Sequence, residues 1–278
     1  LEVPPLYASS LYDGRVSQMC QAPDGRILAP SMDGDVVHVF DEAGNLLSTF
    51  GSGGTGLGQF DTPSGIALDA NGNIYVCDQQ NHRVEKFSST YVPLGTIGSP
   101  GTGPGQLQFP TNCAVSNDGT RLFVTELTNG RVSTFDLDGN FLGSFGSPGS
   151  GPGQFDYPYG IVVDPATGDL FIANEVNNRI DRWRDDGTYL GSFGQLGSGL
   201  DDFHLVVGLG IDVDGNLWAT DQLNNRVKKV SQAGVTLAVF GTYGHGPGEF
   251  YNPWSVFPTR GGAVWVGDTY NYRIEIFR

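Results

Sequence analysis

Short hydrophobic segments alternate with polar turns along the chain. In one stretch these segments lie at 59–69, 73–78, 82–87 and 93–98, and each is bounded by Gly, Asn or Asp. They are rich in Val, Ile, Phe and Tyr, a composition typical of β-strands. No helical periodicity interrupts them, so the pattern predicts an all-β protein.

The pattern repeats at a nearly constant spacing of 47 or 48 residues. The last apolar or aromatic residue of each third segment marks the period: Phe40, Phe87, Phe135, Trp183, Val230 and Phe277. Asp-Gly or Asn-Gly pairs join the first two segments as tight hairpins at 24–25, 71–72, 118–119 and 214–215, since glycine tolerates a positive φ. Four antiparallel strands per copy, repeated six times, predict a six-bladed β-propeller.

The two ends of the chain predict how the ring closes. The last segment stops at Phe277 and Arg278, so the sixth blade lacks a fourth strand of its own. We expect residues within 1–9 to supply this outer strand, because an incomplete blade would expose an unpaired strand edge. The prediction is a single domain, 1–278, with blade cores at about 14–50, 60–98, 109–146, 155–194, 203–241 and 250–278 plus 1–9.

The second copy carries a recognisable motif from Gly58 to Val84, G-Q-F-x-x-P-x-G-I-A-x-D followed by G-N-I-Y-V-x-D-x-x-N-H-R-V. It closely resembles the NHL-repeat family, and copies three to six keep it with substitutions. The resemblance implies a propeller fold but several functions: RNA binding as in tripartite-motif ubiquitin ligases, sensing outside bacterial receptor kinases, or zinc-dependent catalysis as in the peptide-amidating lyase. Propellers of similar shape also serve as lactonases and strictosidine-synthase-like proteins.

The net charge of −15, with only 15 Lys and Arg residues, limits the classes of partner. Binding to phosphate backbones depends on cationic side chains, so we expect no nucleic-acid partner. No apolar stretch approaches the ~20 residues of a membrane-spanning helix, so we expect no membrane insertion. The acidic composition is typical of a soluble exported protein or of one from a salty environment. We therefore expect an extracellular or periplasmic monomer, although residues 1–5 show no signal peptide.

We expect no metal and no cofactor. The three cysteines show no C-x-x-C spacing and are interpreted as small buried residues: Cys20, Cys77 and Cys113. A catalytic zinc site needs three converging ligands. Of the four histidines, only His204 begins an inner strand; the others are His38, His82 and His245.

Five arginines recur with an acidic or amide residue five positions earlier. The pairs are Asp78 and Arg83, Glu126 and Arg131, Asn174 and Arg179, Asp221 and Arg226, and Asp268 and Arg273. A catalytic pair would not appear five times in one chain. We therefore expect each guanidinium to hold a carboxylate or loop carbonyls between blades.

A unique site must break the sixfold pattern. The loops entering the inner strands and the loops joining strands two and three share one face, where blades four to six carry aromatic residues. We expect ligand binding there, because Tyr and Trp combine apolar rings with polar groups. The predicted residues are Tyr157, Tyr159, His204, Tyr251, Trp254 and Tyr270. All but Tyr270 lie in segments entering inner strands, so these five should form one arc near the axis, with Trp254 as the anchor. Alternatively, several of these rings pack between blades.

Two functions remain open from the sequence. The first is a binding scaffold that recognises a protein, peptide, glycan or small molecule on the aromatic face. The second is an enzyme with an axial site, either a metal-dependent lyase or hydrolase or a cyclase-like enzyme that uses Tyr and His as acid and base. A stoichiometric metal ion in the purified protein would favour the enzyme.

Overall fold

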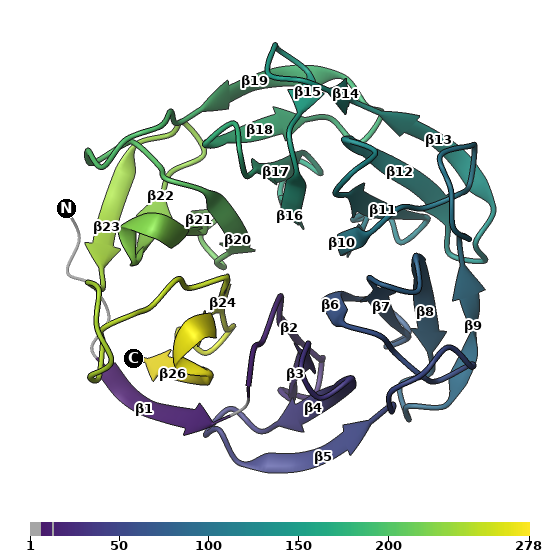
Figure 1. The fold of residues 1–278 in the computed structure, drawn as a ribbon, viewed down its shortest axis with the longest axis horizontal. Coiled ribbons are helices and arrows are strands. Elements are labelled where there is room, and N and C mark those ends of the chain that lie inside the picture. Colours follow the sequence, from purple (N-terminus) through teal and green to yellow (C-terminus); the bar gives the residue numbers. More distant parts are fainter. Residues whose placement is uncertain (1–6, 13) are drawn as a thin grey trace.

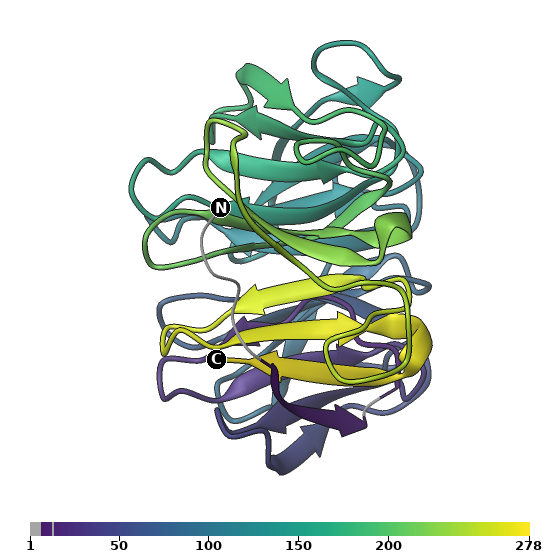
Figure 2. The ribbon, with the colours of Figure 1, turned by 90° about the vertical axis from the view of Figure 1, so that its left-hand side faces the viewer.

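The computed structural model describes the backbone of residues 7–12 and all of residues 14–278. Six four-stranded antiparallel sheets surround a central axis (Figure 1), which confirms the predicted six-bladed β-propeller. In the view turned by 90°, the strands of the last blade run between the two faces of the ring (Figure 2). Among the described residues, no helix is both long and apolar enough to cross a membrane.

Each blade consists of consecutive strands, with the innermost strand first. Blades one to three contain β2 (Cys20–Gln21), β3 (Ile27–Ser31), β4 (Val36–Phe40) and β5 (Leu46–Phe50); β6 (Pro63–Leu68), β7 (Ile74–Asp78), β8 (Arg83–Phe87) and β9 (Pro93–Ile97); and β10 (Pro110–Val115), β11 (Arg121–Glu126), β12 (Arg131–Asp136) and β13 (Phe141–Phe145). Blades four to six contain β16 (Pro158–Val163), β17 (Leu170–Asn174), β18 (Arg179–Trp183) and β19 (Tyr189–Phe193); β20 (Val206–Ile211), β21 (Leu217–Asp221), β22 (Arg226–Val230) and β23 (Thr236–Phe240); and β24 (Ser255–Pro258), β25 (Val264–Asp268) and β26 (Arg273–Phe277).

Short elements lie in the connections between these strands. The parallel pair β14 (Ser147–Pro148) and β15 (Gln154–Phe155) belongs to the linker between blades three and four. The 3₁₀ turns η1 (Gln222–Asn224) and η2 (Thr269–Asn271) join the second and third strands of blades five and six.

The predicted closure by an N-terminal strand is confirmed. β1 (Tyr7–Tyr12) pairs antiparallel with β26, from Tyr7 opposite Phe277 to Tyr12 opposite Arg273. The last sheet therefore has the order β1-β26-β25-β24, and β1 lies at the outer rim beside β26 (Figure 1). The closing strand continues beyond the predicted range 1–9 to Tyr12, and residues 1–6 of that range lie outside the described residues.

The hydrophobic core lies between neighbouring blades. The second strand of each blade is buried almost throughout, and one residue near its start packs against the next blade around the ring. These equivalent residues are Leu28, Tyr75, Phe123, Phe171, Trp218 and Trp265. An aromatic ring therefore fills five of the six equivalent positions, and the first blade has the smaller Leu28.

The repeated arginines hold the blades to the loops, as predicted. The Arg83 guanidinium donates to the Asp78 carboxylate at 2.8 Å and to the carbonyls of Thr55, Gly56 and Gln59 at 2.8–2.9 Å. Arg131, Arg226 and Arg273 form the same ion pair with Glu126, Asp221 and Asp268.

Blade four departs from the predicted pairing. Arg179 pairs with Asp181 at 2.8 Å, while the Asn174 amide donates to the same carboxylate at 2.7 Å. The change of partner from residue 174 to Asp181 has an electrostatic cause, because the neutral Asn174 side chain cannot form an ion pair with the guanidinium.

Hydrogen bonds from polar side chains to the backbone close turns within and between the blades. The Asp136 carboxylate accepts from the Asn140 backbone N–H at 2.8 Å and side chain at 2.7 Å, which closes a hairpin. In a linker between blades, the Gln106 side chain accepts from the Gly103 N–H at 2.9 Å. All three cysteines are free thiols, two of them buried.

Candidate ligand-binding site at the axial mouth

Two rings of equivalent residues surround the axis on one face of the propeller. The first ring lies where each inner strand begins, and the second consists of the residue that follows each second strand. The first ring is Ser17, Ser64, Thr111, Tyr159, Val207 and Trp254. The second ring is Met32, Gln79, Leu127, Glu175, Gln222 and Thr269. The first ring thus has aromatic residues only in blades four and six, Tyr159 and Trp254. The second ring has an acidic residue only in blade four, Glu175.

Members of both rings line a pocket of about 260 Å³ at this mouth. Its walls are Met32, Gln79, Leu127, Tyr157, Tyr159, Glu175, Val207 and Trp254. Every blade contributes at least one of these residues, so the pocket lies on the axis of the ring. Apolar and aromatic side chains dominate, with one amide and one carboxylate among them.

Backbone contacts in blade four fix two of the walls. Tyr157 adopts a left-handed conformation, with φ of 57°, which is unfavourable for a residue with a Cβ atom. Its carbonyl accepts a hydrogen bond from the Glu175 N–H at 3.2 Å. The loop entering β16 is thereby tied to the loop after β17, and this contact places Tyr157 and Glu175 at the same pocket.

Tyr159 and Trp254 form the aromatic part of the pocket. Their rings meet edge to face with centroids 6.0 Å apart, a favourable arrangement for aromatic pairs. The backbone approaches so closely here that a Cβ atom on Gly208 would lie 2.4 Å from the Trp254 carbonyl oxygen. Glycine at this position lets the inner strands of blades five and six come together and fixes the Trp254 backbone.

Several buried polar atoms near the pocket lack partners. The Tyr159 hydroxyl and the Trp254 indole N–H are buried, and neither has a hydrogen-bond partner among the described residues. The Ser17 hydroxyl lies close to the Tyr159 hydroxyl and favours its ionised form, which opposes part of the pKa shift caused by burial. Burial raises the pKa of the Tyr159 phenol, so it stays a hydrogen-bond donor at neutral pH. Unpaired donors of this kind are costly in a folded protein and are commonly satisfied by water or a ligand.

Glu175 provides the charge in the pocket. Burial raises the pKa of its carboxyl to about 7, and the Asp156 carboxylate adds repulsion. Within the described residues, no hydrogen bond or ion pair to this carboxyl group is present. The group therefore exchanges a proton near neutral pH, which is a property typical of functional carboxyl groups.

The sequence prediction did not include Glu175, although the repeat contains a signal for it. Aligning the residue after each second strand gives Met, Gln, Leu, Glu, Gln and Thr in chain order. Glu175 is the one ionisable residue in that set. The signal appears only when this column of the repeat is compared across all six blades.

The six predicted ligand-binding residues separate into different places. Tyr157, Tyr159 and Trp254 share the axial pocket. Tyr251 and Tyr270 instead contact each other, with ring centroids 5.2 Å apart. His204 lines neither group, and its backbone N–H donates to the Asp221 carboxylate at 2.7 Å. Three of the six therefore share one pocket, and ligand binding by the six residues stays a prediction.

The reason is the position of each residue within its repeat. His204 and Tyr251 lie three residues before Val207 and Trp254, and the Tyr251 N–H is bound to the Asp268 carboxylate at 2.7 Å. This contact holds the start of the loop against its own second strand, away from the axis. Val207 and Trp254, at the beginning of the inner strands, line the axial pocket, whereas His204 and Tyr251 do not.

Metal ligands do not gather at this mouth. Across the described part of the chain, no three His, Cys, Asp or Glu side chains are arranged to hold a metal ion. His82 has another role, since its Nδ1 accepts the Phe109 N–H at 3.0 Å and links blade two to blade three.

Comparison with known proteins supports the fold assignment. The NHL repeat family matches residues 60–87, which cover the first three strands of blade two. No curated protein matches the chain at a significant level.

Solved structures of similar shape include a streptogramin B lyase, with 14% identity, a TM-score of 0.68 and coverage of 99% of this chain and 96% of that one. A catalytically inactive virginiamycin B lyase from Staphylococcus aureus with quinupristin has 15% identity, a TM-score of 0.66 and coverage of 99% and 87%. A structural genomics protein of unknown function from Bacteroides thetaiotaomicron has 16% identity, a TM-score of 0.72 and coverage of 99% and 72%. At these identities the likeness extends to the fold alone. The chain is therefore a six-bladed β-propeller that carries an NHL repeat in its second blade.

Proposed function

We propose that this propeller is a binding protein that recognises its ligand in the axial pocket. One observation carries the proposal: the Glu175 carboxyl lies at a mostly apolar pocket with Tyr159 and Trp254 in its wall, and the Tyr159 hydroxyl and the Trp254 indole N–H are buried without partners among the described residues. A few unpaired polar groups converging in an apolar concavity are typical of ligand sites. Bound ligand atoms would supply the missing hydrogen bonds.

The size and chemistry of the pocket favour a compact ligand. About 260 Å³ is slightly below the usual range for drug-sized molecules, so a small molecule or one side chain of a peptide fits best. Tyr157, Tyr159 and Trp254 offer aromatic surface. Glu175 adds a hydrogen-bond acceptor that becomes anionic as it deprotonates. The favoured ligand therefore carries an apolar or aromatic body with a hydrogen-bond donor or an amine.

The location of the protein and its classes of partner are inferred from its net charge. With a net charge of −15, we infer a soluble extracellular or periplasmic monomer that binds a protein, peptide, glycan or small molecule and not a nucleic acid. A free glycan is the least favoured of these ligands, because the pocket is narrow.

A ligand screen with matched variants tests the proposal. Peptides, glycans and small amines would be screened by thermal shift against the parent protein and Trp254→Ala. We expect hits to lose about tenfold or more in affinity in Trp254→Ala, since removal of a central Trp commonly weakens binding by ~2 kcal/mol. Tyr243→Ala is the matched control, because Tyr243 is 62% exposed and lies in the separate cluster with Tyr251. Hits that keep full affinity in Trp254→Ala would place the site elsewhere.

Glu175 also favours a second candidate, an enzyme with acid–base chemistry in the same pocket. A carboxyl group whose pKa is about 7 can accept and return a proton near neutral pH. Because lyases share the fold, quinupristin is a reasonable first substrate, and its turnover can be followed by mass spectrometry. Activity that rises with pH through about 7 and disappears in Glu175→Gln would support the enzyme; no turnover would favour the binding protein.

A further inference from the structure

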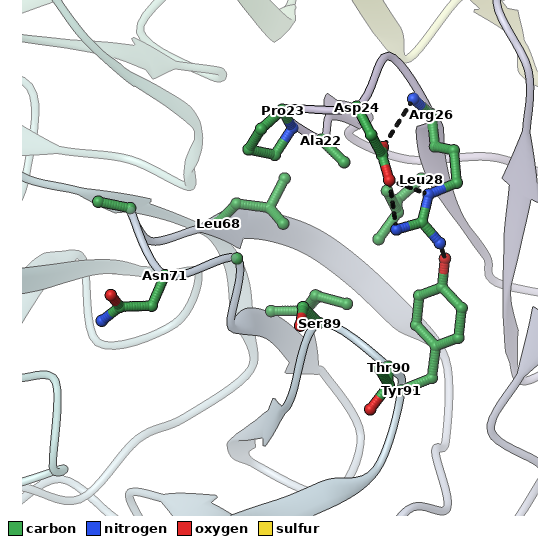
Figure 3. Close-up of a pocket in the computed structure, with 13 residues that line it drawn as sticks. Ala22, Pro23, Asp24, Arg26, Leu28, Leu68, Asn71, Ser89, Thr90 and Tyr91 are labelled. Atoms are coloured by element: carbon green, nitrogen blue, oxygen red, sulfur yellow. Dashed lines mark hydrogen bonds and ion pairs between the residues drawn. The ribbon is translucent and has the colours of Figure 1, made fainter.

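A second pocket, of about 360 Å³, opens between blades one and two (Figure 3). It is bordered by the β2–β3, β6–β7 and β8–β9 turns, which lie on the face opposite the axial mouth. Its floor is apolar and includes Leu28, Leu68 and Ile74. Polar groups of Asn71, Ser89 and Arg26 stand around its edge (Figure 3).

This pocket exists where blade one breaks the sixfold pattern. The other blades place Tyr, Phe or Trp at the position of Leu28, and each ring packs against the following blade. Leu28 faces blade two in the same way, since it shares a core cluster with Ile74. A leucine fills less of this layer than an aromatic ring does. The pocket beside Leu28 therefore lies where a ring is missing.

The arginine that lies over the ring of blade three has a counterpart in blade one. In blade three the Arg121 guanidinium lies over the Phe123 ring at 5.9 Å, two residues along the same strand. Arg26 has the same relation to Leu28 in the repeat and finds no ring there. Its guanidinium instead lies over the Tyr91 ring at 5.3 Å and pairs with Asp24 at 2.6 Å.

Tyr91 is itself an exception to the repeat. Four other blades place glycine at this point of the turn between the third and fourth strands: Gly44, Gly139, Gly187 and Gly234, all with positive φ. Tyr91 adopts φ of 66° although it has a Cβ atom, a conformation that costs about 1 kcal/mol. Its ring stacks on Phe50 with centroids 4.7 Å apart, and the Arg26 guanidinium donates to its hydroxyl.

The strained Tyr91 does not fill the pocket. Because the Tyr91 ring stacks on Phe50, it lines one side of the pocket. The space beside Leu28 and Leu68 stays open (Figure 3). Two independent departures from the repeat thus meet at one cavity: a lost ring at position 28 and an added ring at position 91.

We propose that this pocket between blades one and two binds a small electron-rich aromatic molecule, of the indole or phenol class. The ligand ring lies over Leu28, where the other blades place their own ring, and within reach of Arg26 as a cation–π partner. A polar substituent points to the edge, where the Asn71 and Ser89 side chains offer hydrogen bonds. This site is separate from the axial pocket and shares no wall residue with it.

Indole is the probe for the test, followed by chemical shifts of the ¹⁵N-labelled protein. We expect saturable shifts in residues 22–28, 68–74 and 89–91, with a dissociation constant of about 1 mM or lower. Leu28→Phe supplies the missing ring from the protein itself and should abolish binding while keeping the melting temperature at or above that of the parent.

Two further variants keep the test decisive if Leu28→Phe folds poorly. Tyr91→Gly restores the glycine of the sibling turns and should weaken indole binding at least tenfold in a folded protein. Trp254→Ala alters only the axial pocket and should leave these shifts unchanged. The proposal is overturned if indole gives no saturable shifts at these residues, or if binding there survives both Leu28→Phe and Tyr91→Gly.

Discussion

Tyr159 of blade four and Trp254 of blade six meet edge to face, with ring centroids 6.0 Å apart. The rings belong to equivalent positions of two repeats, and Val207 occupies the same position in the blade between them. The contact is possible because the first residues of the inner strands converge toward the axis. A propeller with small residues at all six positions would leave the mouth open, and these two rings narrow it to a pocket.

Removal of the closing strand should destabilise the whole ring. Deleting residues 1–12 removes β1 and leaves β26 with an unpaired edge, which is unfavourable for a sheet. We expect a melting temperature lower by 10 °C or more, on the order of 2–4 °C per kcal/mol for a domain of this size. Deleting residues 1–6, which keeps β1 whole, is the matched control. Equal melting temperatures for the 1–12 deletion and the parent would contradict the closure.

Loss of a repeated arginine should be costly. Arg83→Ala leaves the buried Asp78 and Glu85 carboxylates without their guanidinium and frees three loop carbonyls. Breaking a buried ion pair in this way commonly destabilises a protein by about 3 kcal/mol. Urea unfolding would measure the change. In the control Arg15→Ala, the pair with Asp33 is about one-third exposed, so its loss should cost less than about 1 kcal/mol.

Glu175 should make stability depend on pH. Its pKa is about 7 in the folded protein against an ordinary value of 4.5, so the folded state binds the proton more tightly than the unfolded state. The stabilisation is fully present below pH 4.5 and is lost as pH rises through about 7. Glu175→Gln should therefore be more stable than the parent at pH 8, by up to about 3 kcal/mol, and the difference should shrink toward pH 4.5. A difference that stays constant from pH 4 to 9 would contradict the perturbed pKa.

Binding to RNA should be undetectable at physiological salt. Five of the arginines are already committed to carboxylates and loop carbonyls, which leaves few cations for phosphate groups. Fluorescence anisotropy with a labelled single-stranded RNA would measure this. A complex with a micromolar dissociation constant that weakens with added salt would overturn the expectation.

The fold was predictable because each blade repeats the same turn residues and the same spacing of apolar segments. Turns such as Asn71-Gly72, the spacing of the apolar segments and the Arg83 motif fix four strands in one copy, and the five other copies repeat the result. The closing strand was predictable in position because the last copy stops one strand short. Its end at Tyr12 was not, since strand pairing with β26 and not a local turn sets that boundary.

The site was harder to predict because residues only three positions apart face different surroundings. Trp254 reaches the axis, whereas the Tyr251 backbone is held by Asp268 and its ring joins Tyr270. Composition alone does not distinguish the two. Glu175 was missed for a related reason, because its meaning depends on the neutral residues at the same position in other blades.

The pairing of β1 with β26 also sets the order in which the ring can assemble. β1 is synthesised before every other described strand, and its partner comes after all of them. β1 therefore has no partner strand while the other blades are synthesised, and the ring can close only after β26 is complete. Contacts between such distant segments slow folding. The pairing of β1 with β26 should consequently be the last contact to form. Chains whose translation stops early would have an open ring with two unpaired blade surfaces.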